Sequence, residues 1–334
     1  MKKILYIGNN IKASNPTTIV QLSILLKEVG FEVVTYSNKQ NKGLRLLEMC
    51  IGVFQHRNAR YILIDTYSTA NFYFALIVSQ LARVLKIAYI PILHGGNLPK
   101  RLHRNPLLSK LIFKNSYLNV APSRYLKNVF EKQDFKTVFI PNMIHLNDYE
   151  FKARIPKDPK LLWVRAFDKI YNPEMAIQVL FELKKTHANA MLCMVGPDKD
   201  GSLASVQQKA SQLGVLDSVE FTGLLSKKVW VEKSKFFDIF INTTNVDNTP
   251  ISVIEAMALG LPVISTNVGG LPYLIKHGGN GFLVAENDAE AMASSIIDLM
   301  QQSEKIKEIT TNARKTVNEF DVEIVQQQWI NLLK

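Results

Sequence analysis

The sequence has few cysteines and no long apolar run. Its two cysteines, Cys50 and Cys193, lie in unrelated segments, and neither has a second Cys or a His at metal-ligand spacing. We expect both to be small buried apolar side chains. No stretch approaches the roughly 20 apolar residues of a membrane span, and the apolar run after the N-terminal MKK is too short for a signal peptide. These absences predict a cytoplasmic protein.

Acidic residues are scarce in the first half. Residues 1–150 hold 20 Lys and Arg but only 8 Asp and Glu, whereas residues 151–334 hold 20 and 21. The net charge of +11 therefore belongs to the first half. Such asymmetry predicts a surface for an anionic partner, whether a membrane, a nucleic acid or a phosphorylated substrate.

Short apolar runs rich in Ile, Val, Leu and Tyr alternate with longer helical patterns along the whole chain. Most of these runs are apolar on both faces, as strands covered by helices must be. The strand candidates are 2–8, 31–36, 61–67, 86–93, 116–122 and 136–141 in the first half, and 161–167, 190–196, 218–223, 238–244, 261–266 and 281–284 in the second. The pattern predicts an α/β protein with two Rossmann-like, doubly wound domains facing a cleft.

The segment 145–160 separates the two sets of strands. It contains two prolines and seven charged residues without a sustained period, which is typical of a linker between domains. We therefore predict a first domain over 1–150 and a second over 151–319. The last segment, 320–334, has a helical apolar stripe that includes Trp329, and we expect it to pack back across the domains.

The stretch DNTPISVIEAMALGLPVISTNVGG, residues 247–270, contains the main chemical signal. Thr249 is a good N-cap and Pro250 suits the first position of a helix. The N–H groups of the next three residues, 251–253, then lack helical partners and favour a phosphate. An ordinary capped helix is the alternative. Glu255 lies among apolar neighbours, so its carboxylate would be largely buried unless it faced the cleft, and it needs donors such as sugar hydroxyls.

The same stretch resembles the acidic-pair motif of glycosyltransferase family 4, whose members are retaining enzymes of the GT-B fold. In that family two Glu residues separated by seven residues are followed by a short helix, a Gly-x-Pro-Val strand entry and a Gly-rich turn. Here Asp247 replaces the first Glu, which changes the reach of that carboxylate. The resemblance implies that Glu255 binds the ribose hydroxyls of a nucleotide-sugar, that Asp247 contacts the sugar, and that the amides of Ile251 and Ser252 face the phosphates. Thr249 and Pro250 belong to the same donor-binding segment.

The resemblance also assigns residues at two other strand ends of the second half. Arg165 and Lys169 correspond to two cations that neutralise the leaving diphosphate, although their separation is shorter than usual; solvated loop charges are the alternative. Gly196 and Pro197 would line the nucleotide pocket. The acids of the following segment, 198–200, could suggest a metal site, but their setting favours a polar turn. No metal or cofactor is therefore expected.

In the first half, His94 ends an apolar strand before two glycines. A capped loop explains this pattern equally well, but the resemblance implies that His94 reaches toward the donor sugar. Family members often have a Gly-rich loop after the first strand, and here only Gly8 remains, which we assign to donor binding. The loop 11–18 that follows is expected to face the acceptor.

The segment 97–116 interleaves cations with apolar side chains. It predicts an amphipathic element on an anionic bilayer or beside a lipid-linked diphosphate. A helix that packs Leu108, Leu111 and Ile112 into the core is the alternative, and nucleic acid is disfavoured because no base-reading module is recognisable. The cations are Lys100, Arg101, Arg104, Lys110 and Lys114.

Together with these observations, the resemblance implies a metal-independent, retaining hexosyltransferase that uses a UDP- or GDP-linked sugar. Its acceptor would be a glycan or a lipid-linked molecule in the synthesis of a polysaccharide, a glycolipid or a cell-envelope glycan. The protein would be cytoplasmic, with contact to the inner face of the membrane. Two alternatives remain: a non-catalytic subunit that binds the nucleotide-sugar, and a nucleotide-sugar epimerase on the same scaffold.

Overall fold

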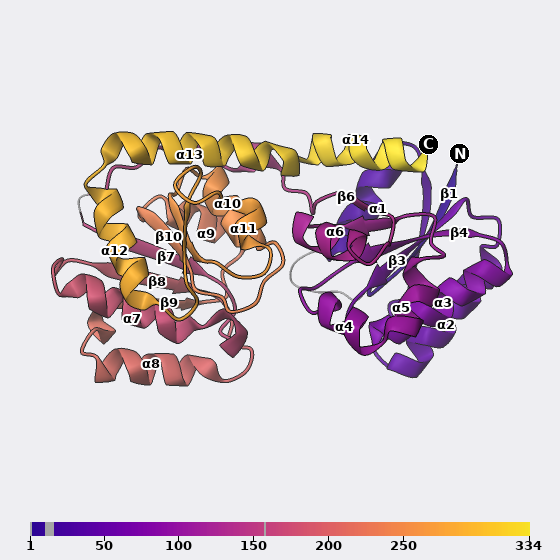
Figure 1. Cartoon of the computed structure of the whole chain (residues 1–334), viewed down its shortest axis with the longest axis horizontal. Helices are drawn as coiled ribbons and strands as arrows, with labels where there is room; N and C mark the ends of the chain where they lie inside the picture. The colour runs from indigo at the N-terminus through magenta and orange to yellow at the C-terminus, as the bar shows by residue number, and fades with distance from the viewer. Residues whose placement is uncertain (1, 11–16, 157) are drawn as a thin grey trace. The chain divides into compact units, whose positions relative to one another are not determined.

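A computed structural model of the 334-residue chain describes residues 2–10, 17–156 and 158–334 (Figure 1). The predicted acceptor loop, 11–18, lies outside this part except for its last two residues. The chain divides into two compact units, of which the first is Met1–Met143 with Val322–Lys334 and the second is Ile144–Asp321. The division thus falls after Met143 rather than at 150, and the C-terminal segment belongs to the first unit.

The first unit is built on a six-stranded parallel sheet in the order β2-β1-β3-β4-β5-β6. Successive residues of β1 point to opposite faces: Ile4 and Tyr6 pack against α1 and α14, whereas Leu5 and Ile7 pack against α2 and α3. This is the pattern of a sheet buried on both sides. The strands are β1 (Lys3–Ile7), β2 (Glu32–Tyr36), β3 (Tyr61–Thr66), β4 (Ala88–Leu93), β5 (Asn119–Ala121) and β6 (Thr137–Phe139).

Helices cover both faces of this sheet (Figure 1). On one face lie α1 (Thr18–Glu28) and α14 (Val322–Leu333). On the other lie α2 (Lys42–Gln55), α3 (Asn71–Val84), α4 (Leu98–Arg104), α5 (Pro106–Phe113) and α6 (Arg124–Glu131). In the described part of the chain, no helix is both long and apolar enough to cross a membrane.

The second unit has a six-stranded parallel sheet in the order β12-β11-β10-β7-β8-β9. Its strands are β7 (Lys160–Val164), β8 (Met191–Val195), β9 (Val219–Gly223), β10 (Ile239–Asn242), β11 (Val263–Thr266) and β12 (Phe282–Val284). One face packs against α7 (Pro173–Lys184), α8 (Ser202–Gln212) and α12 (Ala289–Met300). The other packs against α9 (Lys227–Ser234) and α10 (Ile251–Ala258), with α11 (Leu271–Leu274) and the end of α13 (Ser303–Val317) beside them. All twelve predicted strands are confirmed.

The segment predicted as a linker is packed onto the second unit. Leu146 and Tyr149 of this segment, with the preceding Ile144, join the apolar cluster around α10. The buried Arg154 guanidinium donates hydrogen bonds to the carbonyl oxygens of Phe237 and Leu259. Because these contacts are made to residues far along the chain, the charged composition of the segment gave no sign of them.

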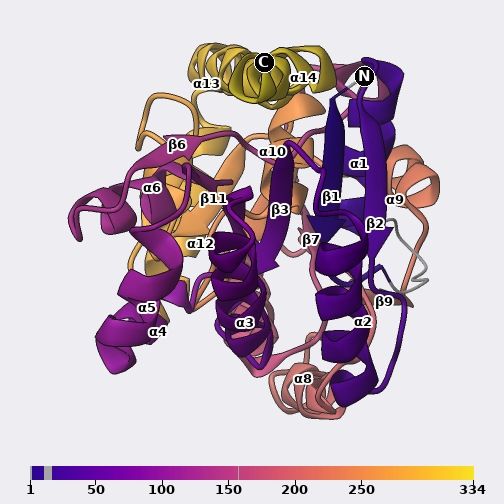
Figure 2. The same ribbon diagram turned by 90° about the vertical axis from the view of Figure 1, so that its right-hand side faces the viewer.

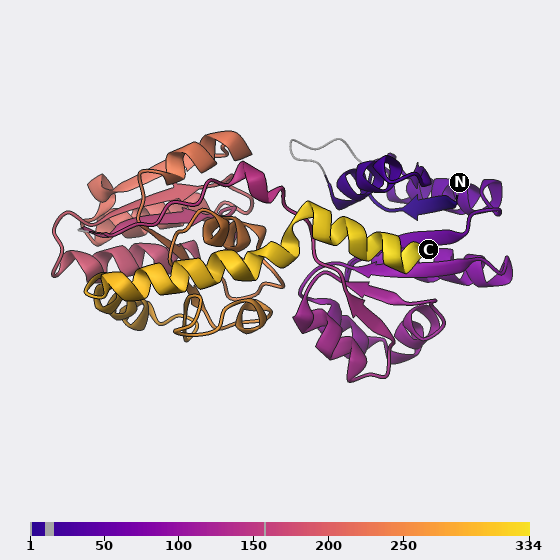
Figure 3. The same cartoon turned by 90° about the horizontal axis from the view of Figure 1, so that it is seen from above.

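The terminal helix α14 belongs to the first unit (Figure 3). Val325, Trp329 and Leu333 are buried with residues of α1 and the first sheet. The segment expected to pack back across the domains is therefore held, through Trp329, on the first unit. Of the two cysteines, Cys193 is buried in β8 and Cys50 is partly buried; burial raises the pKa of the Cys193 thiol to about 12.

Candidate functional site

The donor segment of the second unit begins at the N-terminus of α10. Pro250 itself has an extended backbone and occupies the N-cap position, and its carbonyl oxygen accepts from the N–H groups of Val253 and Ile254. The helix thus starts one residue later than predicted, Thr249 is not the cap, and Val253 has a partner. The N–H groups of Ile251 and Ser252 find no acceptor within the described part of the chain, and the buried Ser252 hydroxyl oxygen has no partner there either. These groups can bind an anion.

Two glycines hold the loop that precedes this helix. A methyl group on Gly269 would collide with the carbonyl oxygen of Asp247, and one on Gly270 would collide with that of Asn248. The Gly270 N–H donates to the Asp247 carbonyl oxygen at 3.1 Å. The Gly-rich turn in the sequence motif therefore lets β11 and its following loop approach closely enough to position Asp247.

Asp247 forms an ion pair with the Arg165 guanidinium at the end of β7. The guanidinium also lies over the Tyr171 ring, 4.5 Å from its centroid. Burial lowers the pKa of Arg165 to about 10, so the side chain stays charged at neutral pH. Its Nε is buried and has no hydrogen-bond partner among the described residues. Arg165 thus offers an unused donor to an anionic ligand.

The turn at Gly196 and Pro197 lies directly beside Arg165. Gly196 has a φ of +154°, and a methyl group there would collide with the Arg165 carbonyl oxygen. The Phe167 N–H donates to the Pro197 carbonyl oxygen at 2.8 Å. The predicted nucleotide-pocket turn and the predicted phosphate-binding cation are therefore neighbours.

The surroundings of Lys169 differ from those of Arg165. Lys169 lies in a short 3-10 helix, Lys169–Tyr171, and its side chain is exposed and forms no ion pair in the described ranges. Its backbone N–H donates to the Asp200 carboxylate at 3.0 Å. Asp198 accepts from Gly201 at 3.0 Å. Both acids are therefore bound by backbone groups, as the polar-turn interpretation predicts.

Glu255 is buried one turn inside α10, with 4% of its surface exposed, as expected from its neighbours. Its Oε1 accepts from the Tyr149 hydroxyl at 2.6 Å and pairs with the Lys227 ammonium at 2.9 Å. Burial, as the largest cause, and the charge of Glu255, as the next, raise the pKa of Tyr149 well above its usual range. No partner is present for Oε2 among the described residues, so this oxygen can accept from a ligand hydroxyl.

Tyr149 and Lys227 were not found by sequence reasoning. Tyr149 lies in the segment taken for a linker, and Lys227 begins α9 in a run of exposed charges. Nothing in either segment points to α10, since both contacts depend on tertiary packing. The one signal available for Tyr149 was its aromatic ring, which it shares with Phe151 in this charged segment.

In the first unit, His94 belongs to a buried polar cluster at the end of β4. Its Nε2 lies 2.8 Å from Oδ1 of Asp65, and the same oxygen accepts from the Tyr6 hydroxyl at 2.9 Å. The Tyr67 ring stacks on the imidazole, with centroids 4.7 Å apart. Gly8 is close by, because a methyl group there would be 2.8 Å from the Asp65 carboxyl carbon. Sequence reasoning missed Asp65, an acid in an otherwise apolar strand.

The basic segment forms α4 and α5. Ile112 is buried and Leu108 packs partly buried against the same cluster, as the packing alternative predicts, but Leu111 is exposed. The rest of the buried side comes from Leu98, Leu102 and Phe113. The Arg101 guanidinium donates to the Ser68 carbonyl oxygen, so Arg101 is bound within the first unit. The side chains of the other four cations, Lys100, Arg104, Lys110 and Lys114, are exposed.

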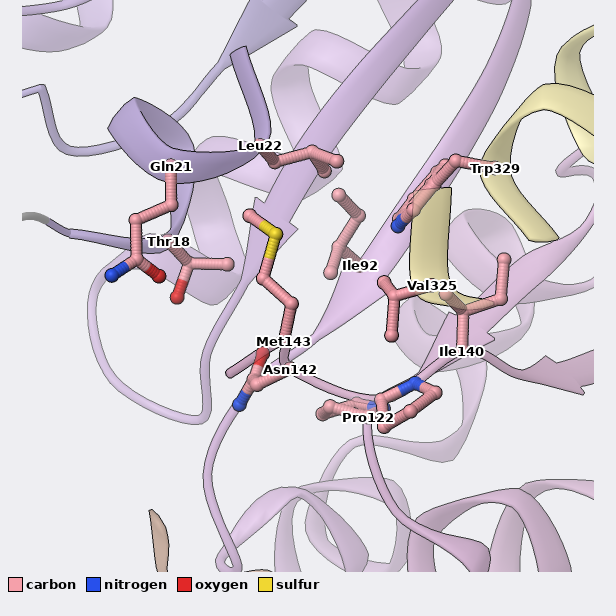
Figure 4. A pocket seen from close by; sticks show the side chains of 11 residues that line it. Thr18, Gln21, Leu22, Ile92, Pro122, Ile140, Asn142, Met143, Val325 and Trp329 are labelled. Atoms are coloured by element: carbon pink, nitrogen blue, oxygen red, sulfur yellow. The ribbon is translucent and has the colours of Figure 1, made fainter. Parts of the chain in front are cut away.

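A small hollow lies between α1, α14 and the segment after β6 (Figure 4). Its walls include Leu22, Ile92 and Trp329, with polar groups from Gln21 and Asn142. This partly open hollow has a volume of about 20 Å³, which has room for about one water molecule.

Comparisons with known proteins identify relatives by both sequence and fold. The family model described as glycosyl transferases group 1 matches residues 147–316. N-acetyl-alpha-D-glucosaminyl L-malate synthase from Bacillus anthracis is 25% identical over 213 residues, which are 64% of this chain and 54% of that enzyme. The match thus spans about half the length of this curated relative.

Two solved structures have the same GT-B architecture. Sucrose-phosphate synthase from Thermosynechococcus elongatus superposes with a TM-score of 0.79 at 17% identity, covering 99% of this chain and 98% of that one. Anabaena HepE in complex with UDP-glucose superposes with a TM-score of 0.77 at 18% identity, covering 100% and 99%. At these identities the likeness shows the fold alone, and the predicted pair of Rossmann-like domains is confirmed.

Proposed function

Because the chain belongs to the glycosyl transferases group 1 family, we propose that it is a retaining glycosyltransferase of family 4. It moves a sugar from a nucleotide-diphosphate-sugar to an acceptor hydroxyl. The observation that carries this proposal is the buried Glu255 carboxylate, one turn behind a helix N-terminus whose first two amides have no acceptor among the described residues. A ribose and a diphosphate have the donors and the charges that these two features require.

The residues of the second unit then have distinct roles. Glu255 accepts from the ribose hydroxyls, while the amides of Ile251 and Ser252 bind the diphosphate. Arg165, with Lys169 as the second cation, stabilises the negative charge that develops on the diphosphate as the glycosidic bond breaks. Asp247 accepts from a hydroxyl of the donor sugar, which requires it to share or release its ion pair with Arg165.

Transfer proceeds on one face of the sugar. The acceptor oxygen forms a bond to the anomeric carbon on the side from which the diphosphate leaves, and the electron pair of the broken bond goes to the diphosphate. A diphosphate oxygen takes the acceptor proton. No protein carboxylate serves as a covalent nucleophile, unlike in retaining hydrolases. His94, oriented by Asp65, contacts the donor sugar.

The donor is a UDP- or GDP-linked sugar, and catalysis needs no metal ion because two protein cations carry the leaving group. The complex of Anabaena HepE with UDP-glucose supports the donor class. The acceptor is a glycan or a lipid-linked molecule used for a polysaccharide, a glycolipid or a cell-envelope glycan. The exposed cations of α4 and α5 support contact with the inner, anionic face of the membrane.

One observation favours a second candidate, a subunit that binds the nucleotide-sugar without transferring it. Asp247 stands where the family has Glu, and its carboxylate is paired with Arg165. If this pair persisted in the donor complex, neither group would serve the sugar or the leaving group. Turnover that appears only in Asp247→Glu would establish this candidate.

A panel of UDP- and GDP-sugars in the presence of EDTA tests the proposal. Thermal shift reports binding, and release of free nucleotide reports reaction. We expect one donor to stabilise the protein and to be slowly hydrolysed. Glu255→Gln should lose both effects, whereas Glu304→Gln, at an exposed carboxylate of α13, should keep them. Binding without release, even with acceptors added, would favour the non-catalytic subunit. Absence of stabilisation by every donor would contradict the proposal.

A further inference from the structure

The outer side of α2 is apolar. Leu44, Leu47, Ile51 and Phe54 are exposed on this helix. Their spacing of three or four residues places them on one side of the helix, and the residues that α2 buries lie on the other. An amphipathic helix of a water-soluble unit normally presents polar side chains outward. This helix has an apolar stripe on each side.

The stripe continues onto the neighbouring helices. α3 exposes Tyr73, Ile77 and Val84, and α5 exposes Leu107 and Leu111. α3 contacts both α2 and α5 and lies between them in Figure 2. These nine side chains, which we call the α2–α5 surface, are each 41–77% exposed. Contiguous exposed apolar surfaces of this kind mark interaction sites.

The helices on the opposite face of the same sheet provide a comparison. Among their described residues, α1 exposes one large apolar side chain, Ile24, and α14 exposes one, Ile324. Both layers cover one sheet in one unit, so the difference does not reflect the size or composition of the unit as a whole. Among the helices of the first unit, the apolar exposure is concentrated on the α2–α5 surface.

The charge around this surface has one sign. Residues 66–130 contain no Asp or Glu but nine Lys and Arg, and this range includes α3, α4 and α5. Of these nine, Arg83 and Lys86 are exposed at the end of α3, and Lys42 adds an exposed cation at the start of α2. The one acid on these helices, Glu48, is bound by Ser37 and Lys39. The apolar stripe is thus surrounded by cations without compensating acids.

We propose that the α2–α5 surface inserts into an anionic lipid bilayer. Its apolar side chains enter the boundary between headgroups and acyl chains, and the surrounding cations bind lipid phosphates. A second copy of the chain fits less well, because a two-fold interface would place these cations opposite one another. Nucleic acid would leave the apolar side chains uncovered. The inference adds an apolar component to the membrane contact of α4 and α5 and does not depend on the donor chemistry.

Vesicle flotation with the full chain tests this inference. The vesicles are phosphatidylcholine alone, or phosphatidylcholine and phosphatidylglycerol mixed two to one. We expect binding to the anionic vesicles at low salt, weakened by high salt. Leu47→Gln combined with Phe54→Gln should lower the partition coefficient by about tenfold or more. The matched control, Ile24→Gln combined with Ile324→Gln on the other helix layer, should bind like the wild type.

Two further measurements separate the outcomes. The thermal shift caused by the donor nucleotide should be the same in both double variants, which shows that they are folded and that donor binding is a separate property. A Phe54→Trp variant should show blue-shifted emission on binding. The proposal is overturned by a lack of binding to anionic vesicles at low salt, or by equal loss in both double variants. It is also overturned if sedimentation shows a dimer that Leu47→Gln with Phe54→Gln dissociates.

Discussion

The hydroxyl group of Tyr149 contributes to the stability of the second unit through its bond to Glu255. Tyr149→Phe keeps the buried ring and removes one donor from a buried carboxylate, at a present O···O distance of 2.6 Å. A hydrogen bond to a charged group is worth about 1.5–3 kcal/mol. The carboxylate keeps its ion pair with Lys227, so the loss should remain in this range rather than exceed it. For a unit of this size the melting temperature should fall by about 3–12 °C.

The ion pair between Lys227 and Glu255 provides a comparison for the Tyr149 hydrogen bond. The Lys227 side chain is 52% exposed, so solvent screens the pair and Lys227→Ala should cost less, about 1 kcal/mol or below. The chain has three tryptophans, of which Trp163 and Trp230 lie in the second unit and Trp329 in the first. In a Trp329→Phe background, tryptophan emission during urea unfolding therefore reports on the second unit alone. If Lys227→Ala cost more than Tyr149→Phe, our account of the Glu255 environment would be refuted.

Three other predictions address the backbone, the first unit and pH. Gly270→Ala should abolish nucleotide binding in calorimetry, because the added methyl displaces the donor loop, while Gly279→Ala, beside a flexible lysine, should bind normally. Asp65→Asn should lower turnover with little effect on nucleotide affinity, because the substitution frees the His94 ring in the first unit, whereas the nucleotide binds the second unit. Equal loss of turnover and nucleotide affinity would contradict this. Because the pKa of Tyr149 is raised in the folded protein, its stabilising effect is full below about pH 10 and falls progressively as the pH rises above it. Urea unfolding of Tyr149→Phe should accordingly show a weaker alkaline loss of stability than the wild type.

The architecture was predictable because its signals are local. Each strand is a short apolar run between turn residues, and a run that is apolar on both faces fits only a sheet covered on both sides. The glycines at 269 and 270 were recognisable as a motif. Their physical reason, the close approach of the loop at Asp247, required the structure.

The rest of the candidate site depends on contacts between distant residues. Tyr149 reaches Glu255 across 106 positions of the sequence, and Asp65 meets Tyr6 and His94 from three different strands. The start of α10 was misplaced by one residue because the carbonyl of Pro250, rather than that of Thr249, accepts the first helical bonds. Sequence spacing favours a proline at the first helical position, but it does not fix which carbonyl begins the helix.

The most direct test of the central claim is the anomeric configuration of the product. The donor identified in the panel is incubated with the wild-type protein and, separately, with Glu255→Gln, and the released sugar or the transfer product is followed by proton NMR from the first minutes. We predict that the wild type first forms the anomer that has the donor's configuration, and that Glu255→Gln forms it at least about tenfold more slowly at the same donor concentration. Initial formation of the opposite anomer, or an equal rate in the Glu255→Gln variant, would contradict retaining transfer at this site.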